Sequence, residues 1–273
     1  MYITNNPHIA AIAQDAGVDR IWIDLEYKGK EARQAGMNTV KSKHTIEDIK
    51  ALRPVVTTSD LMVRVNPIDE DSKDEIDRVV EAGADYIMLP MFKTRQEVEK
   101  FISYVGGRAK TMLLLETAEA AECLETYVDV KGIDEIHIGL NDLHLSYNMT
   151  FMFELLANGT VERIAKVLKQ HNIRFGFGGM ARIGYGTLPA EMILTEHYRL
   201  GSQMAILSRG FCDANLVEDP ESVRGDFVTG VARIREKENE ILTYSAEQFE
   251  SNTATVCQKV AEIVENIKKK SEN

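Results

Sequence analysis

Eight short apolar segments recur along the chain, separated by stretches with helical periodicity. Continuous apolar strands that alternate with helices are typical of a parallel sheet covered by helices. A doubly wound sheet would open an early helix with a glycine fingerprint, whereas "GFGGMARIGYG" comes late and lacks that context. The count of eight therefore predicts an α/β fold, a (β/α)₈ TIM barrel. The expected strands are residues 2–4, 20–26, 61–66, 86–90, 111–116, 135–140, 173–179 and 203–208.

One sequence pattern precedes several of these strands. It reads "AGVDRIWID", "AGADYIMLP" and "KGIDEIHIG", in which a glycine and then an aspartate lead into the apolar segment. The repetition predicts one type of helix-to-strand turn reused at several corners of the barrel. We interpret it as structural, with little catalytic meaning.

Composition narrows the function and the location of the protein. With 44% hydrophobic and 27% charged residues and a formal net charge of −11, the chain is a poor candidate for binding nucleic acid or a membrane surface. Its start resembles no signal peptide, and no apolar run approaches membrane-spanning length. Three scattered cysteines without CxxC spacing indicate reduced thiols and no zinc site. A cytoplasmic location is expected.

The predicted barrel domain covers residues 1–242, and residues 243–273 form an amphipathic helical extension. The apolar stripe of the extension has to be buried on its own barrel or on a neighbouring subunit. We expect a homo-oligomer in which this extension is a contact. The stripe consists of Val256, Val260, Ile263, Val264 and Ile267.

Two of the predicted strands run out into an acidic residue. Glu116 ends "TMLLLE", and Asp142 follows "EIHIGL". In a parallel barrel the carboxyl ends of the strands face one opening, so the two carboxylates can meet over one cation. Two carboxylates completed by water and substrate oxygens suit Mg²⁺ or Mn²⁺. The alternative is that each acid caps the helix that follows it.

Arg64, in "MVRVNP", is the cation among the strand-end residues. A guanidinium there can hold a carboxylate bidentately and stabilise an enolate oxygen. The alternative is a structural ion pair with a barrel acid such as Glu26.

Four motifs together resemble the HpcH/HpaI aldolase/citrate lyase family: "LLLETAEA", "IGLNDLHLS", "VRVNP" and "AGADYIMLPMFKT". The resemblance spans roughly residues 17–211. It implies a (β/α)₈ barrel that binds a divalent metal through Glu116 and Asp142. It also implies that Arg64 contacts pyruvate or its enolate, with Leu140 and Asn141 beside the substrate.

The chain departs from the aldolase branch of that family at the proton-transfer residue. That branch follows its second strand with Asp-x-Glu-His, whereas this chain reads "IDLEYKGK". Glu26 is kept, and Tyr27 occupies the histidine position. His44, in the following loop, is a candidate replacement base, and Tyr27 is another.

The loop after Glu26 is basic, although the protein as a whole is acidic. A basic rim would concentrate an anionic substrate, and Arg182 lies further along the same rim. We therefore expect a partner substrate that carries a phosphate or further carboxylates, bound by Lys41, Lys43 and Arg182. The basic residues of the loop are Lys28, Lys30, Arg33, Lys41 and Lys43.

These observations favour a metal-dependent aldolase or lyase acting on a C–C bond next to a 2-oxo acid. A citrate-lyase-like or malyl-CoA-like enzyme is the alternative, because it does without the missing histidine. A barrel that has lost its chemistry and serves as a binding subunit is a third possibility, which the retained Glu116, Asp142 and Arg64 disfavour.

Overall fold

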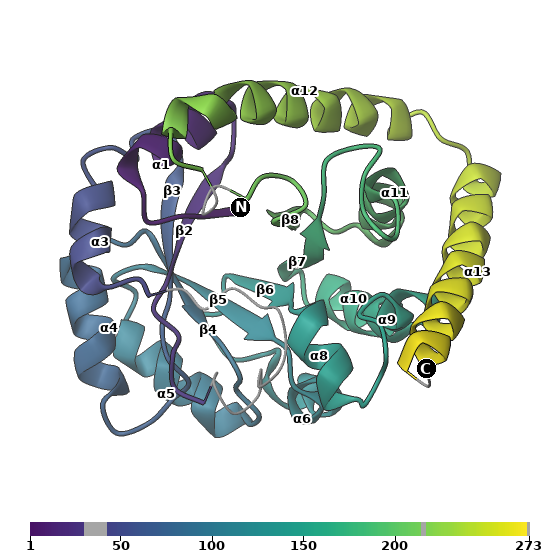
Figure 1. The fold of residues 1–273 in the computed structure, drawn as a ribbon. Coiled ribbons are helices and arrows are strands. Elements are labelled where there is room, and N and C mark those ends of the chain that lie inside the picture. The colour runs from purple at the N-terminus through teal and green to yellow at the C-terminus, as the bar shows by residue number, and fades with distance from the viewer. Residues whose placement is uncertain (30–42, 214–216, 272–273) are drawn as a thin grey trace.

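The strands of the computed structural model form one parallel sheet in the order β1 to β8 (Figure 1). The structure describes residues 1–29, 43–213 and 217–271. Between β8 and β1 the Leu207 amide donates to the Met1 carbonyl at 2.8 Å, so the sheet nearly closes on itself. The strands are β1 (Tyr2–Ile3), β2 (Arg20–Asp24), β3 (Asp60–Arg64), β4 (Tyr86–Leu89), β5 (Lys110–Leu115), β6 (Glu135–Ile138), β7 (Arg174–Met180) and β8 (Met204–Leu207).

Helices follow the strands and lie outside the ring (Figure 1). The arrangement is that of a (β/α)₈ TIM barrel with a C-terminal helix, which confirms the predicted fold. The helices are α1 (Pro7–Asp15), α3 (Ile46–Leu52), α4 (Ser72–Glu81), α5 (Arg95–Val105), α6 (Ala118–Glu122), α7 (Leu124–Tyr127), α8 (Leu140–Ser146), α9 (Glu154–Ala157), α10 (Thr160–Gln170), α11 (Ala190–Leu200), the 3₁₀ turn η2 (Pro220–Val223), α12 (Arg224–Ile241) and α13 (Ala246–Ser271). No described helix is long and apolar enough to cross a bilayer.

The repeated glycine pattern forms the predicted turns. Gly17, Gly83 and Gly132 have φ values of 91°, 99° and 101°, which side-chain-bearing residues rarely adopt. The aspartate two residues later joins neighbouring strands: the Asp85 carboxylate accepts from the Leu61 amide at 2.8 Å. The pattern therefore sets the strand starts and leaves the opposite end of the barrel for the site.

The barrel interior is a packed core. Buried side chains point inward from the strands, as expected where residues alternate between the two faces of a sheet. Near the strand starts, buried Arg20 holds Glu135 through two hydrogen bonds of 2.7 and 3.2 Å. This pair fills the amino-terminal end of the barrel. The inward apolar residues include Trp22, Met62, Tyr86, Met88, Met112, Leu114 and Met204.

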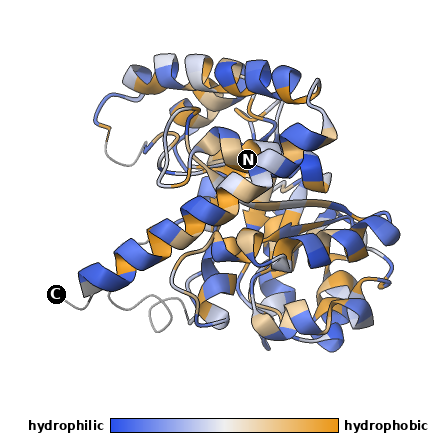
Figure 2. Ribbon diagram, turned by 90° about the vertical axis from the view of Figure 1, so that its right-hand side faces the viewer, coloured by the Kyte–Doolittle hydropathy of each residue, from blue (hydrophilic) through white to orange (hydrophobic). Residues whose placement is uncertain are grey.

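The first half of α13 packs on its own barrel, against α9 and α11. Val256 and Val260 are only 1% and 2% exposed, and the Asn252 amide donates to the Glu196 carboxylate at 2.8 Å. Ile267, further along, is 38% exposed. Figure 2 shows the C-terminal end of α13 extending away from the barrel, with hydrophobic residues on one face. An oligomer contact stays a prediction for this second half alone.

Candidate active site

A cavity of about 260 Å³ lies at the carboxyl ends of the strands. Active sites of (β/α)₈ barrels form at this end, where the loops from all strands meet. The cavity contains Glu116, Asp142 and Arg64, which the sequence singled out. It is lined by Ile3, Trp22, Asp24, Arg64, Leu114, Glu116, His137, Gly139, Leu140, Asn141, Asp142, Met152, Gly178, Gly179, Ile206 and Arg209.

Glu116 follows β5 directly and is 3% exposed. One of its oxygens, Oε1, accepts from the Met91 amide at 3.2 Å. A Cβ on Gly139 would lie 2.9 Å from the Glu116 Cβ, so only glycine lets β6 pass this closely. Helix α6 is capped by Thr117 and not by Glu116, because the Thr117 hydroxyl accepts from the Ala120 amide at 3.1 Å. The capping alternative is therefore wrong for Glu116.

Asp142 lies in the first turn of α8 and not at a strand end. The prediction that it ends a strand is corrected, because β6 stops at Ile138 and α8 begins two residues later, at Leu140. Asp142 still lines the same cavity as Glu116. Burial raises the pKa of Glu116 well above its ordinary value, and the negative charge of Asp142 raises it further. The two carboxylates are thus close enough to repel each other.

This donor set fits a hard divalent cation. Two neighbouring carboxylates offer oxygen ligands and a charge that a cation would relieve. The described residues contain no cluster of three His, Cys, Asp or Glu suited to a metal. Mg²⁺ is commonly held by one or two carboxylates together with water and substrate oxygens, so two protein ligands suffice.

Arg64 is buried in a network of acids. Its Nε and Nη2 donate to the two oxygens of Asp24, each at 2.8 Å, and Nη2 lies 3.3 Å from Glu26. Burial alone would lower the pKa of Arg64, but the charges of Asp24 and Glu26 outweigh it and raise the pKa. The predicted pair with Glu26 is present, and Asp24 is the stronger partner. Arg64 lines the cavity as well, so the pairing fixes a cation at its wall.

The two candidate bases lie outside the cavity lining. Tyr27 is 66% exposed, and its amide donates to the Asn66 side chain at 3.0 Å. His44 is held at the end of β2, where the Asp24 amide donates to its Nδ1 at 3.0 Å. A neutral His44 therefore carries its proton on Nε2. In this arrangement Nε2–H can donate a hydrogen bond, and the ring can accept a proton only after Nδ1 is released.

The other histidines near the site have structural contacts. His137 lines the cavity, but its Nε2 lies 3.1 Å from the Gly178 carbonyl oxygen, to which it donates. Burial lowers the pKa of His137 from 6.5 to about 3. The Nδ1 of His144 lies 3.1 Å from the Leu140 carbonyl oxygen, one turn back in α8.

Of the predicted anion-binding cations, those that the structure describes do not gather at the cavity. Arg182 pairs with Asp226 of α12 at 2.7 Å and does not line the cavity. Lys28 pairs with Asp69 and Asp71, at the start of α4. Lys43 is exposed and outside the lining, and Lys41 lies outside the described residues. Arg182 and Lys28 point elsewhere because acids from distant sequence positions hold them.

Leu140 and Asn141 line the cavity as expected, and two further residues join them that the sequence analysis did not identify. Arg209 follows β8, and its position directly after an apolar segment was the available signal. Trp22 is buried inside the barrel with Arg64 above its ring, 5.0 Å from the ring centroid. Its Nε1 has no hydrogen-bond partner among the described residues.

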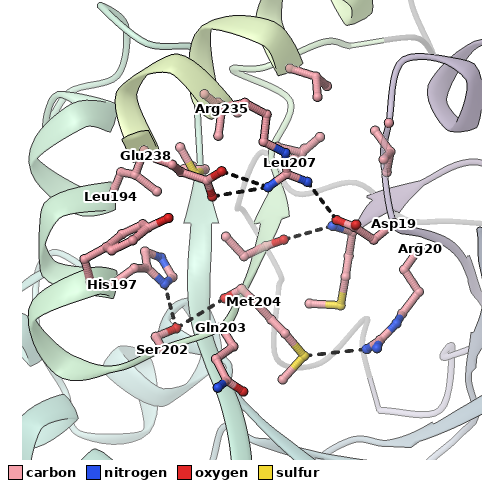
Figure 3. A pocket seen from close by; sticks show the side chains of 18 of the residues that line it. Asp19, Arg20, Leu194, His197, Ser202, Gln203, Met204, Leu207, Arg235 and Glu238 are labelled. Atoms are coloured by element: carbon pink, nitrogen blue, oxygen red, sulfur yellow. Dashed lines mark hydrogen bonds and ion pairs between the residues drawn. The ribbon is translucent and has the colours of Figure 1, made fainter. Parts of the chain in front are cut away.

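A larger cavity, of about 580 Å³, lies between β8, α11, α12 and the start of β2 (Figure 3). Arg235 bridges its mouth, with contacts to Asp19 at 3.1 Å and Glu238 at 2.9 Å. The cavity reaches Arg20, at the amino-terminal end of β2, and contains neither Glu116 nor Asp142. We therefore place the candidate active site in the smaller cavity.

The profile of the HpcH/HpaI aldolase/citrate lyase family matches residues 1–155. The chain belongs to the HpcH/HpaI aldolase/citrate lyase family. This membership supports a carbon–carbon lyase activity. A search of curated proteins found no match.

Solved structures show the same fold. An HpcH/HpaI aldolase from Desulfitobacterium hafniense is 17% identical, with a TM-score of 0.61 over 86% of this chain and 92% of that one. An HpcH/HpaI aldolase/citrate lyase family protein from Burkholderia cenocepacia is 14% identical, with a TM-score of 0.60 over 89% and 95%. The citrate synthase SbnG is 17% identical, with a TM-score of 0.57 over 88% and 93%. At this identity the likeness extends to the fold alone.

Proposed function

We propose that this protein is a divalent-metal-dependent aldolase or lyase that makes or cleaves a C–C bond next to a 2-oxo acid. One observation carries the proposal: Glu116 and Asp142 line one cavity together with Arg64, at the catalytic end of the barrel. Family membership supports the same reaction class. We further propose that the partner substrate is anionic.

Glu116 and Asp142 would hold Mg²⁺ or Mn²⁺. When bound, the cation supplies Lewis acidity toward the carboxylate and carbonyl oxygens of the 2-oxo acid. Arg64 stabilises the enolate oxygen through its positive charge, and Asp24 and Glu26 hold its guanidinium in place before substrate arrives. The Arg64 guanidinium is therefore already in position when negative charge develops on the enolate oxygen, and it does not have to reorganise.

Among the protein groups we assign proton transfer to His44 ahead of Tyr27. The hydrogen bond from the Asp24 amide holds His44 beside the residue that binds Arg64, whereas the Tyr27 side chain faces solvent. Once Nδ1 is released from the Asp24 amide, the neutral ring can accept a proton from the substrate, and the imidazolium so formed returns it to the enolate or to the product oxygen in the opposite direction.

A citrate-lyase-like or malyl-CoA-like acyl-CoA lyase is the second candidate. Tyr27 at the position of the histidine in the aldolase branch favours it. A barrel without catalytic activity is disfavoured. Burying Asp24, Glu116 and the Arg64 guanidinium around an open cavity costs stability, which a binding scaffold has no reason to lose.

Proton exchange tests the function without knowledge of the second substrate. We would incubate the protein with pyruvate and Mg²⁺ or Mn²⁺ in D₂O and follow the methyl group by NMR. We expect deuterium to enter the methyl group only when the metal is present, and we expect Glu116→Gln to abolish this incorporation. No exchange, together with cleavage of malyl-CoA, would replace the aldolase with the acyl-CoA lyase.

A further inference from the structure

A second arginine lines the same cavity as Arg64 and the acids already described. Arg209 lies just after β8, next to the carboxyl end of β7, and joins Arg64 as a cation of the described lining. Arg64 is already bound by Asp24 and Glu26. Two arginines therefore line one cavity.

The turn that carries Arg209 is firmly built. The Ser208 carbonyl accepts from the amides of Phe211 and Cys212, at 2.8 and 3.3 Å, and the Ser208 hydroxyl accepts from Gly210 at 3.2 Å. Phe211 is fully buried and packs on Phe227. The backbone at Arg209 is thus fixed on both sides, in spite of its exposed side chain.

The neighbouring strand leaves space beside this turn. The Ser208 amide donates to the Met180 carbonyl at 3.0 Å, so the ends of β7 and β8 are joined. The cavity wall there consists of Gly178 and Gly179. At Gly178, with φ of 52°, an added Cβ would lie 2.8 Å from Leu140. Glycine at this position lets Leu140 pack against the strand, and the cavity continues past it to Gly179 and Arg209.

We propose that Arg209 binds the carboxylate or phosphate of the second substrate, in the space between Arg209 and Gly178–Gly179. This inference rests on the proposed aldolase function and names the residue that selects its partner substrate. Loops after the seventh and eighth strands frequently bind anionic groups in such barrels. A guanidinium suits this role because it binds carboxylate or phosphate bidentately. The 2-oxo acid occupies the Glu116, Asp142 and Arg64 side, and the anionic end of its partner points to β8.

Two matched pairs of aldehydes test the assignment, with pyruvate and Mg²⁺ in each reaction. Glyoxylate is compared with glycolaldehyde, and glyceraldehyde 3-phosphate with glyceraldehyde. The preferred anionic aldehyde distinguishes carboxylate from phosphate recognition. We expect Arg209→Gln to lower kcat/KM for that aldehyde on the order of 10- to 100-fold, with Arg209→Lys intermediate. The neutral aldehydes should change less than about threefold.

Lys93→Gln is the matched control. Lys93 is an exposed cation that follows β4 at the same end of the barrel, outside the cavity lining, where it pairs with Glu119. Equal losses for charged and neutral aldehydes in Arg209→Gln would overturn the assignment, and so would loss of pyruvate methyl exchange. Either result would place Arg209 at the 2-oxo acid.

Calorimetric titration with unreactive 3-phosphoglycerate and with glycolate separates this inference from the proposed function. The anion site is supported if the affinity for either anion falls in Arg209→Gln but not in Lys93→Gln. This holds even if the wild-type protein catalyses no exchange of the pyruvate methyl protons. Unchanged affinity for both anions in Arg209→Gln would refute the site even if exchange is fast.

Discussion

Glu116 and Asp142 are brought together by different local structures, a strand end and the first turn of a helix. Burial raises the pKa of Glu116 and the nearby charge of Asp142 raises it further, so a proton or a cation would relieve the repulsion. Cation binding by Glu116 and Asp142 should therefore be sensitive to the loss of either carboxylate.

We expect Glu116→Ala and Asp142→Ala each to weaken Mn²⁺ binding at least about tenfold while the barrel still folds, because one carboxylate is too few for a tight site. Calorimetric titration with Mn²⁺ measures this, and circular dichroism checks the fold. Glu119→Ala is the control, since Glu119 is an exposed acid in α6. Unchanged affinity in both variants would remove the metal from these residues.

Arg64 serves both the site and the core, and two substitutions separate the roles. Arg64→Ala removes the guanidinium that pairs with the buried Asp24 and Glu26, and we expect a loss of about 3–5 kcal/mol in unfolding free energy. Arg64→Lys keeps the charge but loses the two-pronged contact with Asp24. It should fold and yet slow pyruvate exchange by about 100-fold. Urea unfolding and the exchange rate are the measurements, and full exchange in Arg64→Lys would exclude an active role for the guanidinium.

A site residue can be predicted from the sequence when the backbone alone positions it. Glu116 and Arg64 end strands, and strand ends can be located from apolar patterns. Lys28 and Arg182 could not be placed in the same way, because Asp71 and Asp226 hold them through tertiary contacts. Arg209 was missed although it directly follows an apolar segment, because no second motif marks that position.

Among the secondary-structure elements, the strands were the most predictable. Each expected segment overlaps an observed strand, and the differences at the ends reach two residues, as after β6, where Leu140 begins α8. The apolar run continues through Leu140 because both a buried strand and a buried helix start need apolar side chains. Periodicity over so few residues cannot separate the two.

Helix α13 divides into a half that packs on its own barrel and a half that extends beyond it (Figure 2). Truncation after Leu242 removes Val256 and Val260 and should lower the unfolding free energy by several kcal/mol, about 1.5–3 for each buried side chain. Truncation after Val264 removes the exposed Ile267, and it should leave stability nearly unchanged and reduce the mass measured by light scattering. An unchanged mass would show that the far half makes no contact between subunits.

Across the whole molecule, buried polar groups occupy both ends of the barrel. Arg20 and Glu135 fill the amino-terminal end, and Arg64, Glu116 and their partners line the open end. Between these ends, His137 is fully buried in the barrel, and His197 of α11 stacks on Phe177 with ring centroids 3.7 Å apart. The stability of the fold should therefore depend on pH through groups that have no catalytic task.

Burial lowers the pKa of both His137 and His197 from 6.5 to about 3. The folded state keeps these rings neutral, whereas the unfolded state takes up protons below pH 6.5, so unfolding becomes easier as the pH falls. Each ring should cost about 1 kcal/mol per pH unit between pH 6 and 5, and the loss should level off near pH 3. Glu116 acts in the opposite direction, because its raised pKa favours proton uptake by the folded state.

The test of this pH dependence accordingly compares the unfolding free energies of two variants. The contribution of Glu116 is the same in both and cancels in the difference. Urea unfolding at pH 7, 6 and 5 should show a smaller decline for His197→Gln than for wild type, by about 1 kcal/mol per pH unit. His171→Gln, at an exposed position after α10, should follow wild type. The stacked and buried state of His197 would be refuted by parallel declines in His197→Gln and wild type, because a solvated histidine contributes no such slope.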